Sequence, residues 1–193
     1  APPAGSLEAN MPQAWAPPAR SHAATMPVVR PPRLEPGDTV GLIEPAGPTF
    51  ESVDLQVAVE IVEALGLKAR PAPHVAARYG YLAGKDEDRA DDVNRLFADP
   101  SVHALLAVRG GWGCARILPH IDWSVIAKNP KILLGYSDLT ALLLAVTART
   151  GLVTFHGPVG ISKWNPFKVG YLRRVLFDGE AVTFENVRET GDS

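Results

Sequence analysis

Residues 131–150, KILLGYSDLTALLLAVTART, decide the fold class of this chain. The apolar run 131–135 has the length and composition of a buried strand, and residues 138–150 have those of a strongly apolar helix. Only Tyr136 and Ser137 lie between the two elements. A short strand that passes directly into a helix is typical of a parallel α/β sheet, in which helices connect neighbouring strands.

The rest of the chain repeats this alternation of short strands and longer helices. The further strands are expected over 40–43, 67–72 and 102–108, and the further helices from Ser52, from Asp86 and over 170–177. We therefore expect an α/β fold with a parallel sheet flanked by helices, Rossmann/flavodoxin-like. Functional loops of such sheets lie at the carboxyl ends of the strands.

The helix from Ser52 is expected to face the core through one stripe of side chains at helical spacing. The members of this stripe are Val53, Val57, Ile61 and Leu65.

The length of 193 residues favours a single core-forming domain with a tail. Residues 1–36 are rich in proline and alanine and are interpreted as a tail without its own core. Residues 37–178 are expected to form the α/β domain, and the polar stretch 179–193 is interpreted as the start of an interdomain linker.

Composition excludes several classes of function. A formal net charge of -2 without any run of basic residues argues against nucleic acid as a partner. No apolar run is long enough for a membrane span, so no membrane partner is expected. The single cysteine excludes an internal disulfide framework, and no Cys/His spacing resembles a metal site, so neither metal nor cofactor is expected. We expect a cytoplasmic protein, with processed export left open.

Ser137 has the position of a nucleophile at a sharp strand-to-helix turn, where a hydroxyl is exposed beside the first free amides of the helix. Of the common pattern G-x-S-x-G, the stretch Gly135 to Leu139 keeps only the first glycine. The alternative is that Ser137 is a helix N-cap, which accepts a hydrogen bond from a backbone N–H near Thr140.

The glycine loop at 110–113 has three interpretations. Its backbone N–H groups could form an oxyanion hole, or it could be a tight turn without a ligand. A phosphate cradle is disfavoured because the third glycine of a dinucleotide fingerprint is missing.

Three other side chains were weighed for chemistry. Cys114 stands beside apolar residues and is expected to be a small core residue. His156 sits at a predicted strand end, and its expected role is a hydrogen-bonded wall of the site. Trp112 could line a pocket, although such aromatic residues usually serve packing first.

Five motifs occur in order along the chain: LEPGDTV at 34–40, YLAG at 81–84, RGGWG at 109–113, GYSD at 135–138 and FHGP at 155–158. Together they closely resemble the LD-carboxypeptidase family of serine peptidases, over about residues 34 to 190. The resemblance implies a two-domain enzyme that cleaves the bond between an L-residue and a terminal D-amino acid in murein peptides, without a metal, through a Ser-His-Glu triad.

The resemblance places Ser137 on the nucleophile. It also implies that the backbone N–H groups of Asp138 and of Gly110 or Gly111 hold the developing oxyanion. The histidine and glutamate of the triad come from the family's carboxy-terminal domain, and no position here matches them. The chain is therefore expected to lack that domain and to be nearly inert by itself.

One departure from the family pattern concerns substrate preference. Relatives commonly have a small Ala-Pro-Ser type stretch after the first strand, whereas this chain has Glu44 followed by Pro45. Glu44 is expected to place a carboxylate near the mouth of the site.

Two other functions stay open at this stage. A related member of the family cleaves an antibiotic-like peptide-nucleotide conjugate, in the manner of microcin immunity proteins, and this chain could belong to such an enzyme. Alternatively, the chain is a non-catalytic module that binds cell-wall peptides. The expected partners are a murein-derived peptide ending in a D-amino acid and the carboxy-terminal domain; a homodimer of the complete protein stays open.

Overall fold

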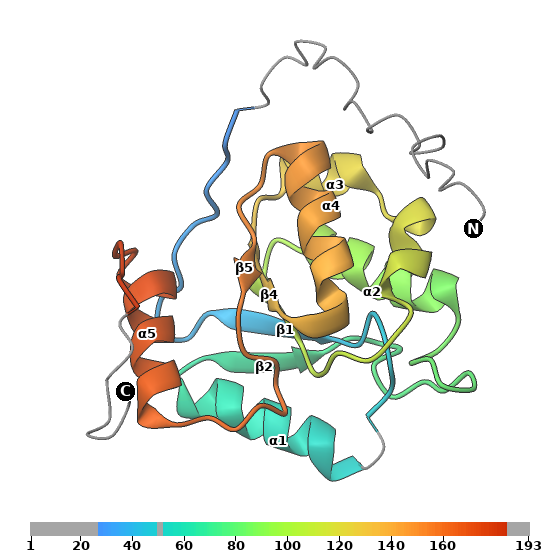
Figure 1. Ribbon diagram of the computed structural model, residues 1–193, viewed down its shortest axis with the longest axis horizontal. Coiled ribbons are helices and arrows are strands. Elements are labelled where there is room, and N and C mark those ends of the chain that lie inside the picture. The colour runs from blue at the N-terminus through green and yellow to red at the C-terminus, as the bar shows by residue number, and fades with distance from the viewer. Residues whose placement is uncertain (1–26, 50–51, 185–193) are drawn as a thin grey trace, which may run out of the picture.

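A computed structural model describes residues 27–49 and 52–184. Its centre is a five-stranded, all-parallel sheet with the strand order β2-β1-β3-β4-β5 (Figure 1). The strands are β1 Thr39–Ile43, β2 Lys68–Pro71, β3 Ala104–Ala107, β4 Ile132–Gly135 and β5 Phe155–His156. This is the flavodoxin-like order, so the expected fold class is confirmed.

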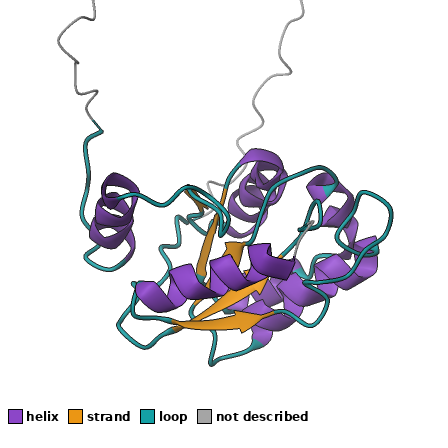
Figure 2. Ribbon diagram, turned by 90° about the horizontal axis from the view of Figure 1, so that it is seen from below, coloured by secondary structure: helices purple, strands orange, loops and turns teal. Residues whose placement is uncertain are grey.

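Helices cover both faces of the sheet. They are α1 Ser52–Ala64, α2 Asp86–Ala98, α3 Trp123–Lys128, α4 Thr140–Thr150 and α5 Pro166–Leu176, with 3₁₀ turns η1 Cys114–His120 and η2 Ser137–Leu139. Figure 1 shows α1 and α5 on one face and α2, α3 and α4 on the other. Figure 2, seen from below, shows a helix layer lying across the strands. Because both faces are covered, the side chains of β3 and β4 are all buried.

The buried face of α1 agrees with the expected stripe only in part: Leu65 belongs to the core and Ile61 packs against it. Val53 and Val57 are 51% and 36% exposed, whereas Ala58 and Val62 lie in the core. The reason is a close approach from another part of the chain: a Cβ built on Gly160 would lie 2.6 Å from the Cβ of Ala58. The small alanine, not the larger valine, therefore faces the sheet layer.

Packing begins earlier along the chain than the expected boundary at residue 37. Val29 forms a parallel bridge with Leu152, with backbone hydrogen bonds to Gly151 and Val153 of 2.9 and 2.8 Å. Leu34 is 5% exposed and belongs to the core. Leu34 also donates its backbone N–H to the carbonyl oxygen of Leu176, the last residue of α5, at 2.8 Å. The remaining part of the expected tail, residues 1–26, and residues 185–193 lie outside the described residues.

The last helix begins four residues before the expected start at Gly170. Asn165 is its N-cap, and the side chain of Asn165 accepts the N–H of Lys168 at 2.9 Å. Pro166 occupies the first helical turn, where its missing N–H costs nothing. Across residues 27–49 and 52–184, no helix has the length and apolarity that crossing a membrane requires.

Candidate functional site

A strand-to-helix turn at Ser137 forms the centre of the candidate site. Ser137 has a φ of 64°, the only positive φ of a non-glycine residue in the described chain. This conformation costs a residue with a side chain on the order of 1–3 kcal/mol and persists only where the surrounding structure imposes it. Here the imposing element is the strand β4, which passes through Tyr136 directly into η2 and α4. The turn leaves Ser137 exposed at the carboxyl edge of the sheet.

Ser137 does not act as a helix N-cap. An N-cap hydroxyl would accept a backbone N–H near Thr140, but the hydroxyl of Thr140 instead donates to the carbonyl oxygen of Ser137 at 2.6 Å. The Ser137 hydroxyl has no hydrogen-bond partner within residues 27–49 and 52–184. It is therefore available to a bound molecule.

The incomplete elbow pattern has a packing explanation. A Cβ built on Gly135 would lie 3.0 Å from Cγ of Leu139 and 3.3 Å from Cβ of Ala107. Leu139, which stands where the pattern has its second glycine, is 1% exposed and fills the core. Because Leu139 fills this space, residue 135 has to be glycine.

The glycine loop after β3 lies against the serine turn. A Cβ built on Gly110 would lie 3.0 Å from Cβ and 3.2 Å from Oγ of Ser137. Gly111 has a φ of 130°, and a Cβ there would lie 2.7 Å from Cα of Gly47 in the loop after β1. The structure thus brings together Ser137 and the two glycines that the sequence analysis selected.

The carboxylate of Asp138 fastens the two loops together. It accepts the backbone N–H of Cys114, at the start of η1, at 2.7 Å. From the sequence, only the backbone N–H of Asp138 was expected to matter, and this side-chain role was not predicted. An acidic residue in the first turn of a helix is the one local signal, and it does not reveal the partner.

A buried guanidinium joins the glycine loop to the loop after β1. Arg89 of α2 is 1% exposed and donates to the carbonyl oxygen of Pro45 and, at 3.0 Å, to that of Gly113. It also pairs with Asp86, which Arg116 contacts from the surface at 2.9 Å. Arg89 was not predicted from the sequence, although its place on the buried face of α2 is a signal for it.

Glu44 lies behind the site and not at an open wall. It directly follows β1 and is 3% exposed, and its Oε1 accepts the N–H of Thr49 at 2.9 Å. Burial raises the pKa of Glu44 to about 7, although the Thr49 hydrogen bond and the charges of Arg78 and Arg109 oppose this shift. The expected position at the site mouth is therefore wrong: the carboxyl group supports the loop from inside.

Trp112 and His156 both lie on the surface near the serine turn. Trp112 is 55% exposed and makes an edge contact with Tyr81, with ring centroids 5.4 Å apart. His156 makes an edge contact with Tyr136, the residue before Ser137, at 6.3 Å. Their role as walls of the site stays a prediction, and within the described residues no hydrogen bond joins His156 to Ser137.

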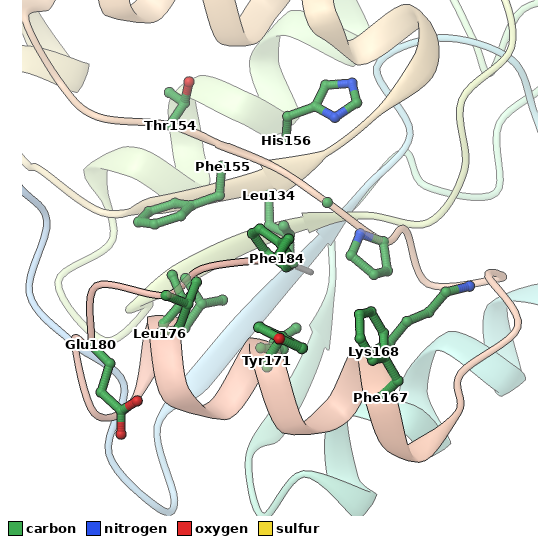
Figure 3. A pocket seen from close by; sticks show the side chains of 15 residues that line it. Leu134, Thr154, Phe155, His156, Phe167, Lys168, Tyr171, Leu176, Glu180 and Phe184 are labelled. Carbon is green, nitrogen blue, oxygen red and sulfur yellow. The ribbon is translucent and has the colours of Figure 1, made fainter. Parts of the chain in front are cut away.

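An apolar groove of about 460 Å³ lies between β5 and α5. Figure 3 shows that the His156 side chain points away from α5. On the α5 side of the groove, the ring of Phe184 stacks on that of Tyr171, with ring centroids 4.6 Å apart. His156 lines this groove, whereas Ser137 does not. Within the described part of the chain, no group of three or more His, Cys, Asp or Glu is placed to hold a metal ion.

The thiol of Cys114 is expected to be unreactive in the folded chain. Cys114 is fully buried, and desolvation, with the nearby charge of Asp138, raises its pKa to about 12. Thiolate is the reactive form, so Ellman's reagent at pH 8 should modify less than one tenth of the native protein in an hour and all of it in denaturant. Rapid modification of the native chain would contradict the core assignment.

Substitution of Gly111 by alanine is expected to lower the free energy of unfolding by about 2–4 kcal/mol, since it adds backbone strain to a steric conflict with Gly47. The matched control is Gly170→Ala in α5, where a Cβ meets nothing within 4 Å. That change should stabilise the chain by up to about 1 kcal/mol. Urea unfolding of both variants measures the contrast, and equal effects would contradict the close loop contact.

Known proteins of one peptidase family are similar to this chain in sequence. A family model described as the LD-carboxypeptidase N-terminal domain matches residues 40–157. A probable murein peptide carboxypeptidase of Bacillus subtilis is 45% identical over 130 residues, which are 67% of this chain and 40% of that protein. The microcin C7 self-immunity protein MccF of Escherichia coli is 34% identical over 127 residues, 65% of this chain and 37% of that protein.

A solved structure has the same fold. The MccF-like protein from Bacillus anthracis superposes with a TM-score of 0.73 and 29% identity, over 78% of this chain and 47% of that one. The chain thus spans less than half the length of each of these three proteins.

Proposed function

The chain belongs to the LD-carboxypeptidase family, and from this premise we propose that it supplies the nucleophile of a serine peptidase that removes a terminal D-amino acid from murein peptides. Ser137 is the proposed nucleophile. The backbone N–H groups of Asp138 and of Gly110 or Gly111 are the proposed donors to the oxyanion.

One observation carries this proposal: an exposed serine in a left-handed turn lies beside a glycine loop. Ser137, at φ 64°, is held where its hydroxyl has no competing partner in the described chain. Gly110 approaches it so closely that a Cβ would lie 3.2 Å from Oγ. Strain of this kind is typical of a nucleophile at the end of a parallel strand.

The proposed reaction has two steps, acylation of the serine and hydrolysis of the acyl-enzyme. Ser137 Oγ attacks the carbonyl carbon of the L-residue, its proton passes to a base, and the carbonyl oxygen becomes negative. Amides fixed near Oγ stabilise that oxygen because they are oriented before the charge forms. The D-amino acid leaves with the proton from the base, and water then hydrolyses the acyl-enzyme. We propose that the base and the acid that orients it lie outside this chain, so that the chain by itself is nearly inert.

Release of D-alanine tests the proposed substrate class. The encoded protein at its full length should release D-alanine from L-Ala-D-Glu-meso-diaminopimelyl-D-Ala, whereas a tetrapeptide with L-alanine at the end should be a poor substrate. Liquid chromatography with mass spectrometry measures the products. Equal cleavage of both peptides would contradict the stereochemical assignment.

A second candidate is cleavage of a peptide-nucleotide conjugate. The observations that favour it are the likeness to MccF in sequence and to an MccF-like protein in fold. The same protein would be assayed with an aspartyl sulfamoyl adenosine substrate analogue that carries a hydrolysable amide. A higher kcat/KM for that compound than for the murein tetrapeptide would favour this candidate over the first.

A further inference from the structure

A single buried carboxyl group, that of Glu44, lies at the start of the loop after β1 and takes no part in the proposed reaction. Glu44 is 3% exposed. Its Oε1 accepts the N–H of Thr49, but its Oε2 has no hydrogen-bond partner in the described chain. The nearest cation to Oε2 is Arg78, whose Nη1 is 4.0 Å away. An unpaired, buried carboxyl oxygen is costly and calls for an explanation.

The loop after β1, which the hydrogen bond between Glu44 and Thr49 closes, contacts the glycine loop directly. Gly47 donates its N–H to the carbonyl oxygen of Gly110 at 3.2 Å, and its Cα leaves no room for a side chain on Gly111. Arg109, the residue before Gly110, donates to the carbonyl oxygen of Pro48 at 2.7 Å. Two hydrogen bonds and one backbone contact therefore connect residues 47 and 48 to residues 109–111.

We propose that Glu44 is a positioning residue that fixes the Gly110 and Gly111 amides beside Ser137 through the loop 45–49. The inference rests on the proposed oxyanion role of these glycines. Glu44 touches no reacting atom and acts only through its hold on Thr49.

The charges that face Glu44 make this hold sensitive to its protonation. Arg78, from the segment after β2, also donates to the carbonyl oxygen of Thr49. Arg109, from the segment after β3, donates to the carbonyl oxygen of Pro48, and its charge also acts on Glu44. When the carboxyl group loses its proton, attraction draws Arg78 from Thr49 toward Oε2. This movement of Arg78 also shifts the glycine loop, because residues 47 and 48, next to Thr49, contact residues 109–111. Burial brings the pKa of Glu44 to about 7, so both forms exist in an accessible pH range.

Amide resonances of the ¹⁵N-labelled 193-residue chain test the coupling without any hydrolysis. Between pH 4.5 and 9, the resonances of Gly47, Gly110 and Gly111 should move along one titration curve. In Glu44→Gln, which keeps an oxygen acceptor for Thr49 but cannot ionise, these resonances should be constant. The matched control Glu60→Gln, on the exposed side of α1, should titrate like the unmodified chain.

Glu44→Ala separates positioning from charge. It removes the acceptor for Thr49, so the Gly110 and Gly111 resonances should be displaced at every pH, while those of Glu44→Gln should stay near the low-pH positions of the unmodified chain. Two results overturn the inference: a titration that persists in Glu44→Gln, or glycine resonances that do not move in either variant or with pH. Because no substrate is used, failure here is distinct from failure of the proposed peptidase function.

Discussion

Replacement of Ser137 by alanine is expected to reduce kcat/KM of the encoded full-length protein for its D-terminal peptide by about 10⁴–10⁶-fold. The hydroxyl is the attacking group, and nothing else within the described chain is placed to replace it: Cys114 is buried with its pKa at about 12, and His156 makes no hydrogen bond to the turn. Steady-state release of the D-amino acid measures the change.

A matched pair of variants separates chemistry from folding. Ser124→Ala, in the exposed first turn of α3, should leave kcat/KM within about twofold of the unmodified protein, since its hydroxyl hydrogen-bonds to Asp122 and to no other described residue. Ser137→Gly should be as inactive as Ser137→Ala but more stable by about 1 kcal/mol, because glycine relieves the left-handed strain. Retained activity in Ser137→Ala would remove the nucleophile from the mechanism.

Replacement of Arg89 by methionine is expected to lower the free energy of unfolding by about 3 kcal/mol or more. Methionine keeps much of the volume of the arginine stem but removes the guanidinium donor from the buried carbonyl oxygens of Pro45 and Gly113, of which Gly113 keeps the N–H of Arg116 at 3.1 Å. Each hydrogen bond from a charged group contributes about 1.5–3 kcal/mol, and one partner of a buried pair cannot be removed without leaving the other uncompensated. Urea unfolding at pH 7 measures the loss.

The control for this variant lies on the same helix. Arg95→Met removes an arginine that is mostly exposed and pairs with Asp91 across one helical turn. Such surface pairs contribute less than about 1 kcal/mol. If Arg89→Met lowered the free energy of unfolding no more than Arg95→Met, the hydrogen bonds of Arg89 to Pro45 and Gly113 would contribute nothing measurable to stability.

Local sequence patterns predicted the sheet and the serine turn because both depend on neighbours in the chain. Because the strand 132–135 passes almost directly into a helix, Ser137 has to lie in a turn at the carboxyl edge of the sheet. The glycine loop was likewise recognisable from its own residues. The start of α5 was also written locally, in the N-cap Asn165 and in Pro166, but was missed.

Features that depend on tertiary partners could not be predicted in the same way. The buried face of α1 is set by the approach of Gly160, which lies about a hundred residues further along the chain. The burial of Glu44 depends on a loop that folds back over it, and the clamp of Arg89 depends on carbonyl groups of two separate loops. A helical or strand period shows which residues share a face, but not which other segment covers that face.

The central claim, that Ser137 is the nucleophile, is tested most directly by covalent labelling. The encoded full-length protein would be treated with a fluorophosphonate, digested, and analysed by mass spectrometry. We expect one phosphonylated serine, Ser137, and no labelling of the Ser137→Ala variant. Modification of a different serine, with Ser137 unlabelled, would contradict it.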